Sequence, residues 1–236
     1  MRRTLIATSA LAFLFAAASG AGAQSITTPY RYIETKHSVG LFGGYLRTDP
    51  GIVVDTLTGA EIALGPKSAP VVGAQYEIRF AGPLSGQVAV SFSPTERSVY
   101  APNPNVREVV PVEVGTEPAT ILMADAGIHF RITGPRTWNG LAPYVTALGG
   151  VVADLRRGGA SEEQVPQNSR FDLGPSFAVG AAVGTEWFPT RRLSLRVEAR
   201  DRLWQIEAPE GLRGNRRDAS DWTNNVAFTF GGALHF

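Results

Sequence analysis

The chain contains no cysteine among its 236 residues. This absence excludes disulfide scaffolds, thiol catalysis, iron–sulfur clusters, cysteine zinc sites and lipid attachment through an N-terminal cysteine. Beyond the N-terminal segment, no apolar run approaches the roughly 20 residues that a membrane-spanning helix needs, which excludes a multi-helix membrane protein. The formal net charge of +1 provides no basic footprint for nucleic acid, so no nucleic-acid partner is expected.

The first residues have the three parts of a secretory signal. Arg2 and Arg3 precede an apolar stretch over residues 5–18, and residues 21–23 read Ala-Gly-Ala. We therefore predict export through the Sec pathway, with residues 1–23 removed. The alternative, an uncleaved anchor helix, is disfavoured because the apolar stretch is only about 14 residues long. Removing the two arginines leaves 22 − 2 = 20 basic against 21 acidic residues, so the mature chain is close to neutral at −1.

Apolar and polar residues alternate with a period of two over most of the remaining chain. At the C-terminus, for example, Phe228, Phe230 and Leu234 share one face, whereas Ala227 and His235 share the other. Two Gly-rich segments, 37–47 and 141–154, are apolar at both odd and even positions. Which of their residues face inward is therefore left unassigned. Asp201 interrupts the alternation of its strand and indicates a bulge or the end of the apolar band. Eight strands are predicted, over residues 37–47, 72–80, 84–92, 122–130, 141–154, 177–187, 193–200 and 225–236.

The links between these strands are of two kinds. Short links cover residues 81–83, 133–140 and 189–192, and long links cover 48–69, 93–119, 155–172 and 207–221. In an up-and-down antiparallel sheet, successive links emerge at opposite ends, so all the long links fall at one end. Short turns opposite long loops are typical of outer-membrane barrels.

A water-soluble barrel would also show alternation, but its apolar face would point inward. Here the polar faces are rich in Gly, Ala and Ser, which suits a narrow interior inside a wide apolar exterior. Ten strand residues rising about 3.4 Å each and tilted by about 40° span roughly 26 Å, close to the apolar band of about 25 Å. In lipid the sheet must close, because an open edge would leave backbone groups unpaired.

The last eight residues, 229–236, read Thr-Phe-Gly-Gly-Ala-Leu-His-Phe. This ending resembles the C-terminal assembly signal of bacterial outer-membrane β-barrel proteins, and the whole mature chain resembles the small OmpA-, OmpX- and OmpW-like barrels in pattern. The resemblance implies an all-β, eight-stranded antiparallel up-and-down transmembrane β-barrel over residues 37–236, preceded by a periplasmic segment over 24–36. It also implies a monomer that contacts outer-membrane lipid and lipopolysaccharide. The barrel assembly machinery would recognise Thr229, Gly231, Leu234 and Phe236.

Charged residues fall on the predicted inner face in equal numbers. A barrel of eight strands is only wide enough for side chains to fill it, and Arg pairs bidentately with carboxylates. We predict a plug of paired charges, although a narrow gated pore in which Arg and Glu exchange partners stays open as an alternative. The predicted network comprises Glu77, Arg79, Asp125, His129, Arg131, Glu186, Arg196, Glu198 and Arg200, with Gln75 and Gln87 beside it.

Catalytic, cofactor and metal sites are not expected. A serine hydrolase needs a His base beside its Ser, and the long loops contain none of the three His residues. His37 and His235 fall at the turn end, and the acidic pair Glu162-Glu163 is expected to be solvated. Aromatic residues near the turns (Trp138, Trp187, Phe188) and near the loops (Tyr100, Trp204, Trp222) could form interfacial girdles or simply pack.

The loops carry β-forming residues as well. Residues 52–64 and 106–114 could extend the barrel strands as hairpins. The sequence therefore favours a structural or surface-interacting outer-membrane protein. A narrow gated channel or a carrier of small hydrophobic solutes is the second reading, and an enzyme that modifies lipid A is the third.

Overall fold

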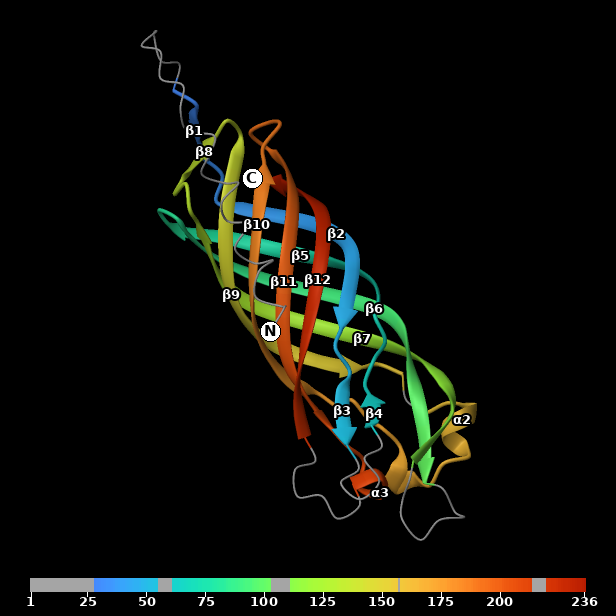
Figure 1. Ribbon diagram of the computed structural model, residues 1–236. Helices are drawn as coiled ribbons and strands as arrows, with labels where there is room; N and C mark the ends of the chain where they lie inside the picture. Colours follow the sequence, from blue (N-terminus) through green and yellow to red (C-terminus); the bar gives the residue numbers. More distant parts are fainter. Residues whose placement is uncertain (1–27, 55–60, 103–110, 157, 214–219) are drawn as a thin grey trace, which may run out of the picture.

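A computed structural model shows an antiparallel β-barrel and describes residues 28–54, 61–102, 111–156, 158–213 and 220–236. Each barrel strand pairs with its neighbour in sequence, and β12 pairs with β2, so the eight-stranded sheet closes on itself (Figure 1). The predicted fold class is confirmed. The barrel strands are β2 (His37–Thr48), β5 (Ala69–Ala81), β6 (Leu84–Pro102), β7 (Pro111–Arg131), β9 (Leu141–Asp154), β10 (Ser176–Trp187), β11 (Leu193–Glu207) and β12 (Ser220–His235).

The end of the barrel that carries the long links, here the loop end, has structure of its own. The long link predicted over 93–119 is largely strand, because β6 and β7 continue past the barrel as a paired ribbon. A separate hairpin joins β3 (Gly51–Val54) to β4 (Glu61–Leu64), as the β-forming residues there indicated. Short helices α2 (Ala160–Glu163), η1 (Gln167–Ser169) and α3 (Glu210–Arg213) lie at the same end (Figure 1). In the described part of the chain, no helix is long and apolar enough to cross a membrane.

The opposite end, here the turn end, carries both the C-terminus and the segment before β2 (Figure 1). Phe236 and His37 exchange two backbone hydrogen bonds, of 2.9 and 3.0 Å. The sequence predicted a short turn over 133–140. The structure shows more, because this link contains β8 (Arg136–Trp138), which pairs with β1 (Tyr30–Tyr32). The predicted signal peptide and residues 24–27 lie outside the described residues.

The outer surface of the barrel is apolar and the inner surface is largely polar. On β12, Phe228 and Phe230 are 58% and 59% exposed, whereas Asn225 and His235 are buried. The two strands whose faces the sequence left open follow the same rule: Leu41 points outward and Ser38 inward on β2. On β9 the residues at even positions from 142 to 148 are buried, and Val145 and Val151 are exposed.

The structure decides between alternatives that the sequence left open at three residues. β11 runs through Asp201 in regular register with both neighbours, so no bulge forms there and the strand continues to Glu207. Trp204 is completely buried inside the barrel, and Phe188 is buried at the turn end, so neither belongs to an outer girdle. Trp138, Trp187 and Trp222 are exposed, as a girdle requires.

Candidate functional site inside the barrel

Four charged side chains from four strands form a closed ring in the interior. Arg131 Nη2 lies 2.7 Å from Glu77 Oε1 and 2.9 Å from Glu186 Oε2. Arg196 Nη2 lies 2.9 Å from Glu77 Oε2 and 2.5 Å from Glu186 Oε1. Each arginine therefore bridges the same two carboxylates, and all four carboxylate oxygens are paired. The alternation of β5, β7, β10 and β11 directs these residues inward, because inward side chains recur at every second position.

A second group of four charges lies next to the ring, toward the loop end. Arg202 Nη2 is 2.6 Å from Asp125 Oδ2, and Arg200 Nη1 is 3.1 Å from the same oxygen. Arg200 Nε is 2.7 Å from Glu198 Oε1, and Tyr144 donates its hydroxyl to Glu198 Oε2 at 2.8 Å. Both groups are electrically neutral. All eight charged residues are at most 6% exposed.

Glutamine and tyrosine side chains connect the two groups. Gln87 Nε2 donates to Gln75 Oε1 at 2.8 Å. In the opposite orientation of its amide, the Gln87 oxygen takes the place of Nε2. The donation to Gln75 Oε1 is then lost, and Gln87 accepts from Arg196 at 3.1 Å and from Arg200 at 3.2 Å. The Arg196 guanidinium also lies 5.0 Å from the centre of the Tyr144 ring, which is within range of a cation–π contact.

The structure changes one member of the predicted network. Arg79 is half-buried at the turn end, where its Nη1 donates to the carbonyl of Ile33, and it pairs with none of the interior carboxylates among the described residues. The pairing of β5 with β6 shifts register between Arg79 and Ala81, which ends the regular alternation there. Arg202, which the sequence reasoning missed, is the fourth arginine. Its even position on β11, shared with Arg196 and Arg200, was the available signal.

His129 is buried beside the ring. Its Nδ1 lies 3.3 Å from the Thr146 hydroxyl, its ring packs on Tyr144 with centroids 4.1 Å apart, and its Nε2 has no hydrogen-bond partner. One ligand atom each of Glu77, His129 and Glu186 lies within 4.8 Å of the others, which is a spacing that could hold a metal ion. Arg131 and Arg196 occupy the carboxylate oxygens, however, and their positive charges oppose a cation at this place.

Beyond the charged groups, toward the loop end, the interior contains a layer of apolar side chains. Buried residues of the barrel wall pack with residues from the loops, and Trp204 is at most 2% exposed, like Met123 and Ile121. The sequence reasoning assigned a polar lining to the whole interior and did not foresee this layer. Its members are Leu46, Leu64, Val71, Ala119, Ile121, Met123, Val152, Phe171, Leu173, Ala178, Trp204, Ile206, Ala208, Leu212 and Ala227.

The acidic pair near α2 is only half solvated. Glu163 is exposed, as predicted, but Glu162 is buried and lies 2.6 Å from Arg97 Nη2. Next to it, Glu117 of the β6–β7 ribbon accepts a hydrogen bond from the backbone N–H of Ser161 at 2.5 Å. This bond, and one from the Ser161 side chain, hold the pKa of Glu117 below its ordinary value of 4.5.

A serine and a histidine pair at the turn end. Ser194 Oγ and His235 Nε2 are 2.7 Å apart, which is the distance of a nucleophile and its base. Ser194 has no exposed surface, and the His235 ring packs against Phe188. The pair therefore lies in the packed wall rather than at a surface that a substrate can reach.

The residues of the C-terminal motif lie along β12. Leu234 and Phe236 are exposed on the outer surface, and Thr229 and Gly231 face inward. A Cβ atom on Gly231 would lie 2.4 Å from the carbonyl oxygen of Leu41 on β2. Glycine at this position therefore permits the close approach of the strands that close the barrel, in addition to any role in recognition.

No family model and no curated protein matches this chain. Solved structures do. The neisserial surface protein NspA matches with a TM-score of 0.51 at 11% identity, over 85% of this chain and 97% of that one. The outer-membrane protein OprG of Pseudomonas aeruginosa matches with a TM-score of 0.52 at 14% identity, over 86% and 97%. The chain has the fold of the small eight-stranded outer-membrane barrels. At these identities the likeness concerns the fold alone.

Proposed function

We propose that this chain is an integral outer-membrane protein of a Gram-negative-type bacterium, exported through the Sec pathway, with a structural or surface-interacting role and a closed interior. The observation that carries the proposal is the pairing of the eight charges of the ring and the group beside it, inside a barrel whose outer surface is apolar. An apolar exterior on a closed sheet suits acyl chains. The turn end then faces the periplasm and the loop end faces the exterior.

Two layers close the interior in this proposal. The charged groups fill the middle of the barrel, and the apolar layer around Trp204 fills the loop end. A water path along the barrel would have to separate Arg131 and Arg196 from their carboxylates and also hydrate an apolar layer. The first step is unfavourable because it leaves buried charges without partners, and removing one partner of a buried ion pair costs about 3–5 kcal/mol. The second step is unfavourable because it brings water into contact with apolar side chains.

Planar-bilayer recording tests the closed interior. We expect the purified wild-type protein to give no steady conductance. A variant that removes bulk from both layers, Arg196→Ala with Trp204→Ala, should give ion-conducting openings, since it deletes side chains that fill the barrel cross-section. Steady conductance of the wild-type protein would contradict the closed interior and support the gated channel.

The proposal includes partners during and after assembly. The C-terminal residues Thr229, Gly231, Leu234 and Phe236 would engage the barrel assembly machinery, and the barrel would contact outer-membrane lipid and lipopolysaccharide as a monomer. Deletion of Phe236, which is 65% exposed, should reduce the amount of heat-modifiable, folded protein in outer-membrane fractions. Unchanged assembly of this variant would argue against recognition of the terminal residue.

A carrier of small hydrophobic solutes is the second candidate, and the apolar layer at the loop end favours it. A solute that entered there would have to displace side chains around Trp204. Quenching of Trp204 fluorescence by brominated alkanes, compared with a Trp204→Phe variant, measures such entry. The closed barrel predicts no quenching beyond that of the exposed Trp138, Trp187 and Trp222.

A further inference from the structure

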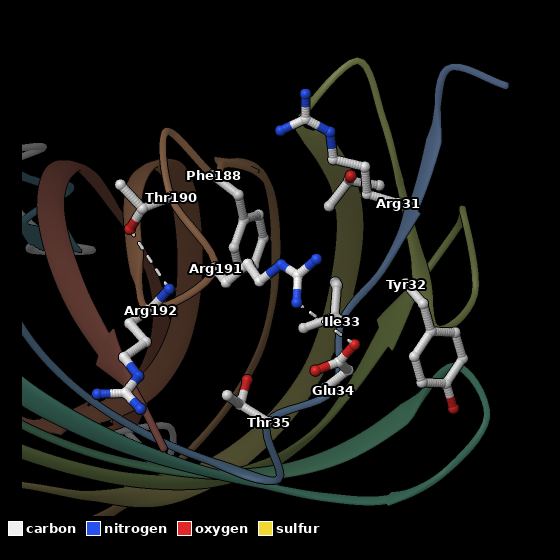
Figure 2. Close-up of a pocket in the computed structure, with 10 residues that line it drawn as sticks. Arg31, Tyr32, Ile33, Glu34, Thr35, Phe188, Thr190, Arg191 and Arg192 are labelled. Atoms are coloured by element: carbon white, nitrogen blue, oxygen red, sulfur yellow. Dashed lines mark hydrogen bonds and ion pairs between the residues drawn. The ribbon is translucent and has the colours of Figure 1, made fainter. Parts of the chain in front are cut away.

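A cavity of about 290 Å³ opens at the turn end, between segments from distant parts of the chain (Figure 2). One wall is the segment over residues 31–35, and another is the turn between β10 and β11, over residues 188–192. Thr137 of β8 completes the lining. The volume is at the lower end of the range of small-molecule sites, which begins at about 300 Å³. The cavity lies outside the charged interior.

The lining of this cavity has an excess of positive charge. It contains Arg31, Arg191 and Arg192 against the single carboxylate of Glu34. Arg191 Nη1 and Glu34 Oε1 are 3.9 Å apart, and their side chains are 88% and 70% exposed, so this pair is loose and weak. Within the described part of the chain, Arg31 and Arg192 pair with no carboxylate. Two guanidinium groups are thus available to an anion.

Two hydroxyl groups that line the cavity have no hydrogen-bond partner. Thr137 is 3% exposed, and its Oγ1 is buried without a partner; the Oγ1 of Thr35 is in the same state. A buried polar group without a partner destabilises the folded protein, because it has lost its hydrogen bonds to water. Neither oxygen is exposed to the cavity in this conformation, but rotation of a threonine side chain about its Cα–Cβ bond would turn the hydroxyl toward the cavity, where it could donate to a ligand with acceptor oxygens. The cavity therefore offers neutral donors beside its charged ones.

The same cavity has an apolar wall. Ile33 and Phe188 are 5% and 8% exposed and pack together with Ala142 as a small apolar cluster. Figure 2 shows the Phe188 ring beside Arg191, and Ile33 beside Glu34. On the outer surface, Trp138 and Trp187 directly adjoin the lining residues Thr137 and Phe188 in the chain, and each is 48% exposed. Exposed indole rings at one rim of a barrel mark the level of the lipid head groups.

We propose that this cavity binds the phosphate group of an anionic phosphate ester. Arg191, Arg192 and Arg31 hold the phosphate oxygens through charge-assisted hydrogen bonds, the hydroxyls of Thr35 and Thr137 donate to the same group, and Phe188 contacts the apolar part of the ligand. A phospholipid head group of the inner leaflet and a soluble phosphate ester both carry this chemistry. The site lies apart from the closed interior and goes beyond the function proposed above.

Binding is measured on the full mature chain in nanodiscs of zwitterionic phosphatidylcholine. In one arm, phosphatidylglycerol is added and native mass spectrometry counts the lipids that stay bound. In the other arm, glycerol 3-phosphate is titrated and the amide chemical shifts of residues 31–35, Phe188 and residues 190–192 are followed by NMR. We expect the double variant R191Q/R192Q to bind at least about tenfold more weakly, since it removes charge-assisted hydrogen bonds from both side chains.

Two further variants make the test specific. K36Q/R136Q removes the same amount of charge at the same end but from exposed residues outside the lining, so its binding should equal that of the wild type. Thr137→Val removes the unpartnered hydroxyl at nearly constant volume. It should weaken binding while leaving the stability of the free protein equal or higher, which a merely structural hydroxyl would not do.

The two arms separate the sources of the phosphate. Binding of both probes, lost in R191Q/R192Q, supports the site and shows that a soluble ester suffices, whereas binding of phosphatidylglycerol alone supports a lipid head-group site. Equal retention of both phospholipids, or unchanged binding by R191Q/R192Q, overturns the proposal. Heat-modifiable electrophoretic mobility of the same samples reports barrel insertion independently. Failure to insert would contradict the proposed function. Titration of glycerol 3-phosphate in detergent would still show whether the cavity binds a phosphate ester.

Discussion

Arg131 and Arg196 each contact both Glu77 and Glu186, so every charge in the interior ring has two partners. Loss of one member should therefore be strongly destabilising, because two carboxylates would then share one arginine in a site where each side chain is at most 3% exposed. Replacing all members together removes the desolvation cost as well as the attraction. For this reason a whole buried network can often be replaced by apolar residues with little loss of folding stability.

Arg196→Met should therefore lower the free energy of unfolding by about 3–5 kcal/mol. Urea titration in lipid vesicles, followed by tryptophan fluorescence, measures the change. Arg136→Met, at an exposed position, is the matched control and should change stability by less than about 0.5 kcal/mol. The fourfold variant with Leu for both glutamates and Met for both arginines should be more stable than Arg196→Met. The opposite order would show that the ring is not a mutually paired unit.

Glu117 gives a prediction about pH at the loop end. Its pKa is lowered in the folded protein by hydrogen bonds from Ser161, so its contribution to stability is complete above the pKa of the unfolded chain and is lost as the pH falls through the folded value. Hydrogen exchange at the Ser161 amide, corrected for the intrinsic rate, should show protection that decreases on acidification below 4.5. Glu117→Gln should show lower protection at neutral pH and a flat profile. A pH-dependent profile in Glu117→Gln would refute the assignment.

Sequence parity placed most interior charges but not all of them. It located Glu77, Asp125 and Arg196 because the alternation of their strands is regular. It placed Arg79 in the network because Arg79 shares the parity of Glu77, and alternation does not show that its side chain reaches the carbonyl of Ile33 at the turn end instead. It missed Arg202 because the alternation breaks at Asp201, which indicated a bulge or the end of the apolar band. The strand continues in register through Asp201, which accepts a hydrogen bond from Asn224 at 3.1 Å on the outer face.

At the scale of elements, barrel closure depends on how closely β12 approaches β2. A Cβ atom on Gly231 would meet backbone of β2 at 2.4 Å, whereas one on Gly43 would find its nearest neighbour at 3.8 Å. The two glycines thus lie on the two strands whose pairing closes the barrel, here the seam. Gly43 has room for a side chain, whereas Gly231 does not.

Gly231→Ala should destabilise the barrel by about 1–3 kcal/mol, since the strand must shift to accommodate the methyl group. Gly43→Ala, at an unhindered position, should change stability by less than about 0.5 kcal/mol. The urea midpoint in lipid vesicles and the yield of heat-modifiable protein provide the readout. Equal effects of the two substitutions would mean that the seam does not constrain Gly231.

Most of the strands that the sequence predicted have strong periodicity, whereas β2 and β9 were predicted as strands without an assignment of their faces. The alternation of β5, β6 and β12 gave strands near their observed positions, and the β-forming residues near 52–64 gave the hairpin of β3 and β4. The short helices α2 and α3 span four residues each, which is too few for a helical period to show. The pairing of β1 with β8 joins residues about a hundred positions apart, and nothing local encodes it.

For the whole molecule, the apolar outer surface and the neutral paired interior both result from the alternation of outward and inward residues along a closed sheet. The fold follows from alternation and from the lengths of the links, both of which are present in the sequence. The apolar layer around Trp204 does not, because inward residues at the loop end are apolar like the outward ones, and only the closed sheet distinguishes the two faces. This layer and the charged groups together determine whether the interior admits water.

The apolar exterior and the closed interior are tested most directly by paramagnetic relaxation enhancement, measured by NMR on the protein in nanodiscs. The effects of a lipid-dissolved and a water-soluble paramagnetic reagent are compared. The account predicts that the lipid reagent attenuates the signals of Leu41, Val183 and Phe228, which are 70%, 58% and 58% exposed on the barrel wall. It predicts that neither reagent attenuates Glu186, Arg196 and Trp204, which are at most 3% exposed. Attenuation of the interior residues by the water-soluble reagent, or of the wall residues by that reagent alone, would contradict it.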